Sequence, residues 1–192
     1  MKKVVALMGS PRKNGNTSNL IKEIIRGAEK SGAETKVFNL IDMNIKPCQA
    51  CYYCRKHESC SIKDDMQELY ESIKDADAII IGSPIYMFQV TGQMKQLMDR
   101  LYPLLSGENG IYQLRYGRKK TVAVYSHGAP EGSFKEYLIH NKKSLGLLGL
   151  DVVDTVICDM ANDPRTALNR NELLETAYTI GGNLTNSTKF TK

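Results

Sequence analysis

The stretch "VVALMGSPRKNGNTSNLIKEIIRGA", residues 4–28, is the clearest indication of the fold, because its pattern changes in the middle. It opens with an unbroken apolar run, 4–8, as in a strand that is buried on both faces of a parallel sheet. After a polar loop, apolar residues recur at the spacing of one helix face, at Leu20, Ile21, Ile24, Ile25 and Ala28. The stretch therefore predicts a strand, a loop and a helix in immediate succession.

The same succession repeats along the rest of the chain. Further apolar and β-branched runs predict strands at 37–40, 78–81, 121–125 and 152–157. Apolar residues at helical spacing predict helices from Met66 to Ile73, from Met94 to Leu101 and from Phe134 to Leu148. Asp64 or Asp65 is the expected N-cap of the helix at Met66. Asp163 and Pro164 are expected to begin a last helix that ends near Gly181.

Five strands that alternate with five helices predict an α/β protein with a flavodoxin-like sheet. We expect parallel strands in the order 2-1-3-4-5, with helices on both faces of the sheet. A single domain is expected over residues 1–180, with a cysteine-rich insertion at 44–63 and a polar tail over 181–192. This fold binds ligands outside the carboxyl ends of its strands, so the loops after the first, third and fourth strands form the candidate site.

The composition is that of a soluble globular protein. The 192 residues are 42% hydrophobic and 24% charged, with a formal net charge of +5. The sequence has no signal-peptide pattern and no apolar run of about 20 residues, so we expect a cytoplasmic protein that binds neither membranes nor nucleic acid. The densest basic cluster, "LRYGRKK" (114–120), is interpreted as a solvated turn before a strand, although it could attract an acidic partner or an anionic cofactor.

The first loop, "GSPRKNGNTSNL" (9–20), is rich in groups that donate hydrogen bonds. It lies directly before a helix, whose first N–H groups form a natural anion site. It contains neither the Gly-Lys-Ser/Thr of a nucleotide phosphate loop nor G-x-G-x-x-G. Capping of the helix by Asn16 or Thr17 would explain one of its donors but not all of them. We therefore predict that the loop binds a terminal monophosphate, through Ser10, Arg12, Asn16, Thr17 and Ser18.

Two later loops place apolar and small residues where a ligand would lie. In "GSPIYMFQVTGQMKQLMDR" (82–100), an apolar group directly follows the third strand: Pro84, Ile85, Tyr86, Met87 and Phe88. Their exposure is costly unless a planar ring system or another subunit covers them. In "SHGAPEGS" (126–133), the candidate contacts are Ser126, His127 and Gly128. The glycine would permit close approach of the backbone, whereas His127 could instead be structural.

These loops, in this order and spacing, resemble the NAD(P)H-dependent FMN reductase group of flavodoxin-like proteins. With "PCQACYYCRKHESC" (47–60) after the second strand, the resemblance narrows to the iron–sulfur flavoproteins of that group, and it extends to about residue 160. It implies FMN, a [4Fe–4S] cluster, a homodimer or homotetramer, and electron transfer rather than reduction of free flavin. It also implies that loop 9–20 holds the FMN phosphate and that Pro84 to Phe88 line the isoalloxazine ring.

Four of the five cysteines lie in this segment with the spacing C-x2-C-x2-C-x5-C, at Cys48, Cys51, Cys54 and Cys60. They match the four thiolates that a [4Fe–4S] cluster requires. The negative charge of such a cluster would be offset by the nearby cations Lys46, Arg55, Lys56 and Lys63. A zinc site, which more often uses two separated C-x2-C pairs, and reduced or disulfide-linked cysteines are the alternatives. Cys158 is most simply a buried apolar residue.

Three functions are compatible with these residues. The first is electron transfer between a ferredoxin-like carrier and an acceptor, and the net positive charge would favour an acidic partner. The second is NAD(P)H-dependent reduction of FMN or a quinone, in which case the cysteines are structural or bind zinc. The third is a non-catalytic binding module that zinc stabilises. No side chain is assigned as an acid–base catalyst.

Overall fold

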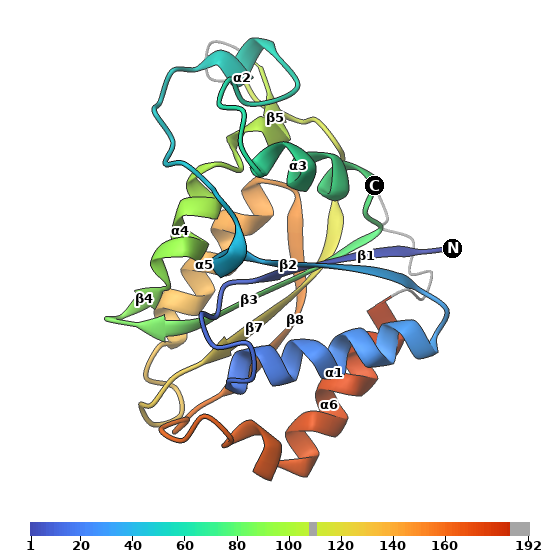
Figure 1. The fold of residues 1–192 in the computed structure, drawn as a ribbon, viewed down its shortest axis with the longest axis vertical. Helices are drawn as coiled ribbons and strands as arrows, with labels where there is room; N and C mark the ends of the chain where they lie inside the picture. Colours follow the sequence, from blue (N-terminus) through green and yellow to red (C-terminus); the bar gives the residue numbers. More distant parts are fainter. Residues whose placement is uncertain (108–110, 185–192) are drawn as a thin grey trace.

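The computed structural model describes residues 1–107 and 111–184, which form a central sheet between two layers of helices (Figure 1). The parallel strands are β1 (Lys3–Met8), β2 (Glu34–Asn39), β3 (Ala78–Tyr86), β7 (Lys119–Ser126) and β8 (Leu150–Cys158). They lie in the order β2-β1-β3-β7-β8, which confirms the flavodoxin-like topology predicted from the sequence. A short strand, β4 (Gln89–Val90), pairs antiparallel with the end of β3.

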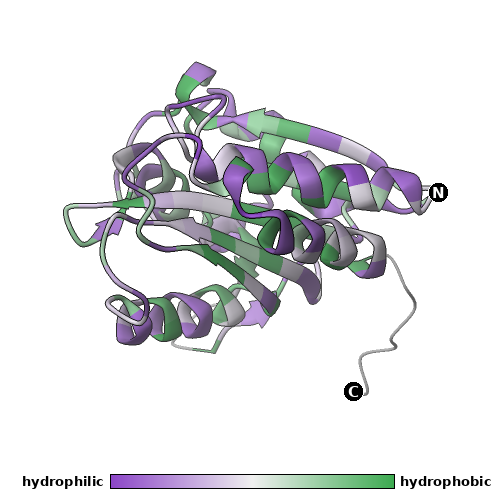
Figure 2. Ribbon diagram, turned by 90° about the horizontal axis from the view of Figure 1, so that it is seen from below, coloured by the Kyte–Doolittle hydropathy of each residue, from purple (hydrophilic) through white to green (hydrophobic). Residues whose placement is uncertain are grey.

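Helices cover both faces of the sheet, as predicted (Figure 1). They are α1 (Asn16–Lys30) and α6 (Asn171–Leu184) on one face, and α3 (Met66–Asp75), α4 (Gly92–Asp99) and α5 (Lys135–Leu147) on the other. Alternate residues of a buried strand point to opposite faces of the sheet. In β1, Val4 and Ala6 therefore pack with α1, while Val5 and Leu7 pack on the side of α3 and α4. Figure 2 shows the apolar strands enclosed between the two helical layers.

The cysteine segment forms a lobe beyond α3 (Figure 1). It contains a short helix, α2 (Tyr53–Lys56), which packs against a hairpin of β5 (Leu105–Ser106) and β6 (Gln113–Leu114). Single turns of 3-10 helix complete the described chain at Leu40–Asp42, Tyr102–Leu104 and Ala167–Asn169. Across residues 1–107 and 111–184, no helix combines the length and the apolar character needed to cross a membrane.

The third strand is longer than predicted. The apolar run 78–81 marks only its first half, and pairing with β7 continues as far as Pro84. The chain then turns back as a hairpin, in which Ile85 pairs with Val90. Glycine and proline are poor strand residues, so the sequence pattern ends at Gly82. The neighbouring strands nevertheless provide partners for this backbone, which makes Pro84 and Ile85 strand residues rather than loop residues.

The last helix begins later and ends later than predicted. Asp163 and Pro164 do not start it; Asp163 accepts a hydrogen bond from the backbone N–H of Arg165 (2.7 Å) and forms a turn instead. The helix starts at Asn171 and continues to Leu184, which is buried, so the predicted tail over 181–192 begins inside a helix. The rest of that tail, 185–192, lies outside the described residues.

Two glycines explain why α6 passes through its predicted end. A Cβ atom on Gly181 would lie 1.9 Å from the carbonyl oxygen of Ile24, and one on Gly27 would lie 2.0 Å from that of Tyr178. Gly181 is therefore a contact between two helix backbones rather than a helix terminus. Rotation of a side chain could not relieve either clash, because the atom that the added Cβ would meet is a backbone carbonyl oxygen in both cases.

Substitution of Gly27 by alanine is expected to lower the free energy of unfolding by about 1–3 kcal/mol, the usual cost of overpacking. Urea denaturation followed by circular dichroism would measure it. Gly182→Ala is the matched control, because its Cβ would meet nothing closer than the Ser31 hydroxyl at 3.4 Å. This control should be neutral or stabilising by up to about 1 kcal/mol, since alanine favours helix over glycine. Equal stability of the two variants would contradict the close packing of α1 and α6.

Candidate functional site

A cleft opens at the carboxyl ends of β1, β3 and β7, the place where this fold binds its ligands. It brings together residues of all three predicted loops and of the turn that follows β8. Its lining consists of Ser10, Arg12, Gly15, Asn16, Thr17, Pro84, Ile85, Tyr86, Ser126, His127, Gly128, Ala161 and Pro164. Of the contacts predicted for these loops, Ser18, Met87 and Phe88 do not line the cleft.

The N-terminal end of α1 faces this cleft without a side-chain cap. Gly15 is the N-cap residue, in extended conformation, and the first turn of the helix contains no acidic residue. The first N–H groups of an α-helix have no acceptor within the helix, and the helix dipole adds partial positive charge at the same place. Arg12, which is exposed at the mouth of the cleft, adds a full positive charge. The arrangement suits an anion.

The other polar residues of loop 9–20 use their side chains to shape it. The side chain of Asn16 donates to the carbonyl of Asp163 (2.8 Å) and accepts from the N–H of Ala167 (2.8 Å), which fastens the turn after β8 to α1. The Thr17 hydroxyl lies 2.7 Å from that of Ser126, which joins the first and fourth loops. Ser18 is fully buried and donates to the carbonyl of Arg12 (2.8 Å). The sequence predicted all of these donors as phosphate contacts. It could not distinguish the side chains that hold the loop in shape from those that face a ligand.

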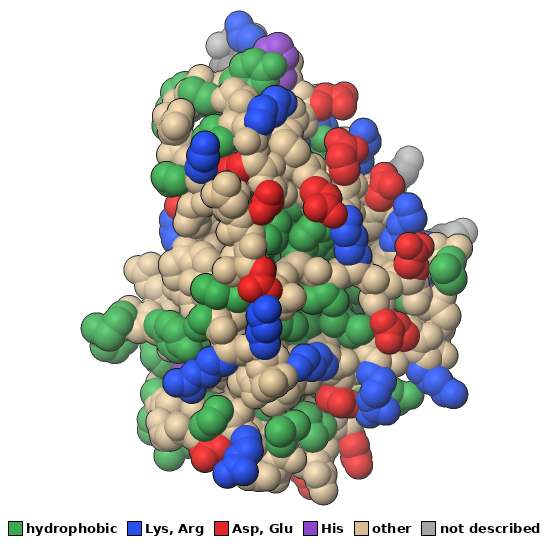
Figure 3. All heavy atoms as spheres, in the orientation of Figure 1, with side chains coloured by type: hydrophobic (Ala, Val, Ile, Leu, Met, Phe, Trp, Pro, Cys, Tyr) green, Lys and Arg blue, Asp and Glu red, His purple; other side chains and the backbone are tan. Residues whose placement is uncertain are grey.

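The five apolar residues after the third strand divide into two groups. Pro84 and Ile85 are buried at the floor of the cleft, and Tyr86 stands beside them half exposed. Met87 and Phe88 form the tip of the β3–β4 hairpin, 86% and 73% exposed, both with left-handed backbone (φ 45° and 70°). The hairpin projects from the molecule with apolar atoms at its end (Figures 1 and 3).

The loop after β7 is arranged by its own contacts. His127 is buried, its Nδ1 lies 3.0 Å from the carbonyl oxygen of Ala129, and its ring meets that of Phe134 edge to face at 4.9 Å. These contacts favour the structural role of His127, although the residue also borders the cleft. A Cβ on Gly128 would lie 2.3 Å from Asn162 Oδ1, so the glycine admits the neighbouring loop.

Gly15, Ala161 and Pro164 are cleft residues that sequence reasoning missed. Ala161 and Pro164 follow β8, whose loop was not considered as part of the site. The available signal was the Asp163–Pro164 pair, which was interpreted as a helix start although the same pair is typical of a turn. Gly15 was visible as the residue before α1, but no side chain drew attention to it.

The cysteine segment has unusual backbone between its first three cysteines. Ala50 and Tyr52, which lie between the first three cysteines, both have left-handed backbone (φ 50° and 58°), an unusual conformation for residues other than glycine. Cys48 and Cys51 are exposed, Cys54 is partly buried and Cys60 is buried. Burial raises the pKa of the Cys54 thiol, and the charges of the other three cysteines raise it further, so each of those three lies within electrostatic range of Cys54.

The state of these thiols bears on the disulfide alternative. All five cysteines of the chain are free thiols, which provides no support for a disulfide. Among residues 1–107 and 111–184, no three His, Cys, Asp or Glu side chains are placed to share one metal ion.

Arg115 holds this lobe against the domain. Its Nη2 donates to the carbonyls of Cys54, His57 and Leu105 (3.2 Å each), and its Nε donates to that of Pro103 (3.1 Å). The interpretation of 114–120 as a solvated turn is therefore wrong at Arg115, which is half buried. A guanidinium has donors in several directions and can satisfy carbonyls from two segments at once, which the sequence cannot show.

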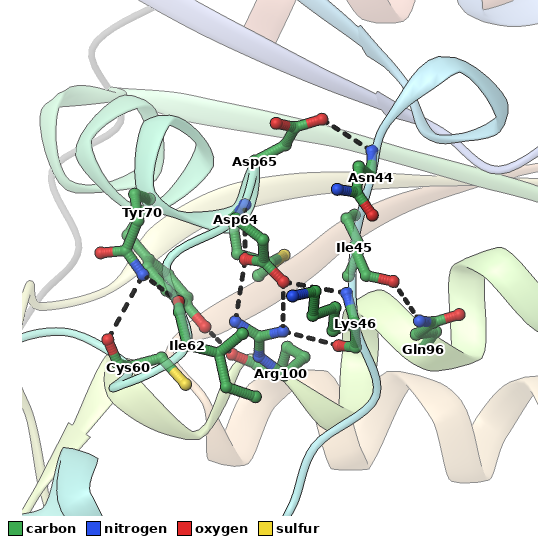
Figure 4. Close-up of polar contacts among 12 residues, drawn as sticks. Asn44, Ile45, Lys46, Cys60, Ile62, Asp64, Asp65, Tyr70, Gln96 and Arg100 are labelled. Atoms are coloured by element: carbon green, nitrogen blue, oxygen red, sulfur yellow. Dashed lines mark hydrogen bonds and ion pairs between the residues drawn. The ribbon is translucent and has the colours of Figure 1, made fainter.

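A buried ion pair closes the base of the same segment (Figure 4). The Asp64 carboxylate, 0% exposed, binds Nη1 (2.8 Å) and Nη2 (3.1 Å) of Arg100, which is 1% exposed. Asp64 also accepts from the N–H of Lys46 (2.9 Å), and Arg100 donates to the Lys46 carbonyl (2.6 Å). We name this group of three residues the clasp. Burial raises the pKa of Asp64, but the bonds from Arg100 and Lys46 outweigh it and keep that pKa below its ordinary value.

The start of α3 agrees with the sequence, which predicted Asp64 or Asp65 as its N-cap. Asp65 is the N-cap residue, but its side chain caps no N–H of the helix and accepts from the N–H of Asn44 (2.6 Å) instead. Asp64 does accept from the N–H of Met66 (3.2 Å), while most of its bonding capacity goes to the clasp. Lys46 and Asp64 lie at the two ends of the cysteine segment, 18 residues apart in the sequence. The guanidinium of Arg100 binds both and so joins the two ends of this loop.

Comparison with known proteins places these features in a family. Residues 2–163 match the family model described as NADPH-dependent FMN reductase. The chain is 37% identical to an iron-sulfur flavoprotein of Methanocaldococcus jannaschii over 150 residues, which cover 75% of this chain and 76% of that protein. It is also 37% identical to an iron-sulfur flavoprotein of Archaeoglobus fulgidus over 135 residues, which cover 70% and 69% of the two chains.

Solved structures agree on the fold. The NAD(P)H:quinone oxidoreductase from Methanothermobacter marburgensis superposes with a TM-score of 0.72 at 20% identity, covering 95% of this chain and 98% of that one. An azoreductase from Bacillus anthracis gives a TM-score of 0.72 at 14% identity, covering 95% and 99%. At such identities the likeness concerns the fold alone.

Proposed function

The chain belongs to the NADPH-dependent FMN reductase family and to the iron–sulfur flavoproteins within it, and from this premise we propose that its cleft binds FMN and its cysteine loop a [4Fe–4S] cluster. The protein is a flavin-dependent oxidoreductase. The observation that carries the proposal is the cleft itself, where the positive end of α1 stands beside the apolar end of β3. FMN has the matching parts, an anionic phosphate and a flat ring.

The FMN phosphate would lie at the N-terminal end of α1. There the backbone N–H groups of the first turn and the Arg12 guanidinium can donate to its oxygens. Ser10 also lines the cleft, but its hydroxyl donates to the Arg12 carbonyl (3.2 Å) and accepts from the Arg12 N–H (3.2 Å). Asn16, Thr17 and Ser18 act mainly by keeping the loop in this shape, since their side chains are bonded within the protein. The ring would lie over Pro84, Ile85 and Tyr86, with Ser126, His127 and Gly128 along its edge.

The cluster would be bound by Cys48, Cys51, Cys54 and Cys60. The other three thiols act electrostatically on that of Cys54, and Lys46, Arg55, Lys63 and Arg115 supply positive charge around the loop. The left-handed residues Ala50 and Tyr52 support the same proposal, because strained backbone persists where a site requires its shape.

Bound FMN exchanges one or two electrons and a [4Fe–4S] cluster exchanges one, so together they join two-electron to one-electron chemistry. We propose electron transfer between an acidic ferredoxin-like carrier and an acceptor, supported by the net charge of +5. Reduction of the flavin by NAD(P)H is the second candidate, which the family description favours. Stopped-flow mixing with each donor distinguishes them, and only reaction with the carrier should slow markedly as ionic strength rises.

We also propose that a second copy of the chain covers the hairpin tip, in a homodimer or homotetramer. Two adjacent large apolar side chains, Met87 and Phe88, are exposed there on strained backbone. Such a tip is costly in water and typical of a contact between subunits. Light scattering of the wild-type protein and a Met87→Ser, Phe88→Ser double variant would test this.

Analysis of anaerobically purified protein tests the two cofactors. We expect bound FMN, together with four iron and four acid-labile sulfide per chain. Zinc at one per chain without sulfide would contradict the cluster and favour the structural alternative. Absence of flavin absorbance, with none restored when FMN is added, would contradict the flavin site and favour a non-catalytic module.

A further inference from the structure

Arg100 carries a donor that the clasp leaves unused. Its Nε is buried and has no hydrogen-bond partner, whereas Nη1 and Nη2 are bonded to Asp64 and Lys46. Such buried donors are rare in folded proteins and call for an explanation. In the described residues there are two others, Arg55 Nε and Asn141 Nδ2. Two of the three thus belong to arginines of the cysteine lobe or its base.

Besides the exposed Cys51, the cysteine that lies within the electric field of this arginine is Cys60. It is the buried one of the four and packs in the same apolar cluster as Tyr70, which donates to the Arg100 carbonyl (2.6 Å). Burial lowers the pKa of Arg100, but Asp64, Tyr70 and Cys60 outweigh it and the net shift is upward. The guanidinium is therefore a permanent cation, and a thiolate at Cys60 lies within its field.

We propose that Arg100 is a positioning residue of the cluster: it closes the base of the cysteine loop with Asp64, and it keeps a buried positive charge and a spare N–H donor beside Cys60. This inference rests on the proposed cluster. Reduction by one electron adds one negative charge to a thiolate-bound cluster, so a nearby cation favours the reduced form and raises the potential. The effect is strong because burial excludes the water that would screen it.

Because Arg100 and Asp64 carry opposite charges, substitution of each in turn distinguishes an electrostatic effect on the cluster from a purely structural one. Arg100→Met removes the cation and leaves the Asp64 carboxylate, so the midpoint potential of the cluster should fall. Asp64→Asn leaves the cation without its partner, so the potential should rise. Both substitutions break the clasp, so both should accelerate loss of iron. If the clasp were only structural, both variants would lose iron faster, but their midpoint potentials would not shift in opposite directions.

The experiment is a dithionite titration with redox mediators, followed by electron paramagnetic resonance, on anaerobically purified wild-type protein and variants. We expect each substitution to change the reduction equilibrium at least tenfold, which is 59 mV for a one-electron couple, in opposite directions. Iron release to a chelator is measured on the same samples. Arg100→Lys keeps the charge but not the bidentate contact, so it should lose iron faster with a potential close to that of the wild type.

Arg26→Met is the charge-matched control, because Arg26 lies on α1, on the other face of the sheet, and pairs with Glu23. It should leave both readouts unchanged. Shifts of the Arg100→Met and Asp64→Asn potentials in the same direction, or no shift, would overturn the inference while the cluster stands. If Arg100→Met does not fold, the inference is tested by Asp64→Asn alone, and an unchanged midpoint potential of the cluster in that variant would overturn it. Wild-type protein without iron and sulfide would overturn the proposed cluster as well.

Discussion

Replacement of Cys60 by serine is expected to abolish the iron–sulfur cluster while FMN remains bound. Each iron of a [4Fe–4S] cluster needs a thiolate, and a serine hydroxyl is a poor substitute. Cys60 is also the buried member of the four, so no solvent-exposed group can take its place without rearrangement of the core around it. Iron and sulfide per chain should fall from four to near zero, measured chemically after anaerobic purification.

The flavin provides the internal reference for this variant. The cleft residues come from the carboxyl ends of β1, β3 and β7 and include none of the cysteines, so the FMN content should equal that of the wild type. Cys158→Ala is the matched control, because Cys158 is buried in the opposite core beside α1 and α6. It should retain the full iron and sulfide. Four iron in Cys60→Ser would exclude Cys60 as a ligand.

The second large effect is expected at Arg12. Arg12→Met should weaken FMN binding about 10–100-fold, because a hydrogen bond to a charged group contributes about 1.5–3 kcal/mol. Arg12→Glu should weaken it further, since a carboxylate at the mouth of the cleft repels the phosphate. Fluorescence titration of the deflavinated protein with FMN measures both dissociation constants. Riboflavin, which has no phosphate, should bind all variants alike.

Lys13→Met is the control that distinguishes the effect of the Arg12 charge at its own position from the effect of net charge on FMN binding. Lys13 is the next residue, but it pairs with Asp42 (2.7 Å) and does not line the cleft. Its removal changes the net charge by the same amount, and the dissociation constant for FMN should stay within about threefold of the wild type, as expected for an exposed and screened charge. Equal losses in Arg12→Met and Lys13→Met would mean that Arg12 makes no direct contact with the phosphate.

The clearest sequence predictions concern elements with a strong local pattern. The strand at 4–8 and the helix after loop 9–20 were predicted because each buried element shows its own period in the sequence. The start of α6 was predicted wrongly for a related reason. Asp163 and Pro164 suit a turn as well as a helix start, and the choice depends on Asn16, which lies far away in the sequence and binds this turn from α1.

Within the candidate site the same division applies. Residue types and their place after strands indicated an anion site, an apolar platform and a group of thiols, because chemistry of this kind is a property of side chains. Which of those side chains face the cleft depends on contacts: Ser18 is turned toward Arg12, and Met87 and Phe88 lie at the tip of a hairpin. The carbonyl of Arg12 settles the case of Ser18, and the pairing of β3 with β4 settles that of Met87 and Phe88.

The amino-acid sequence was sufficient for the order of the sheet, the family and the four clustered cysteines, since apolar periods and short spacings are local properties of the chain. The roles of Arg100 and Arg115 required the folded molecule. In the sequence both are ordinary cations, one at the end of a helix and one in a basic run. Folding removes water from Arg100 and aims both guanidiniums at the backbone of a distant loop, because buried donors and charges must find partners wherever the fold places them.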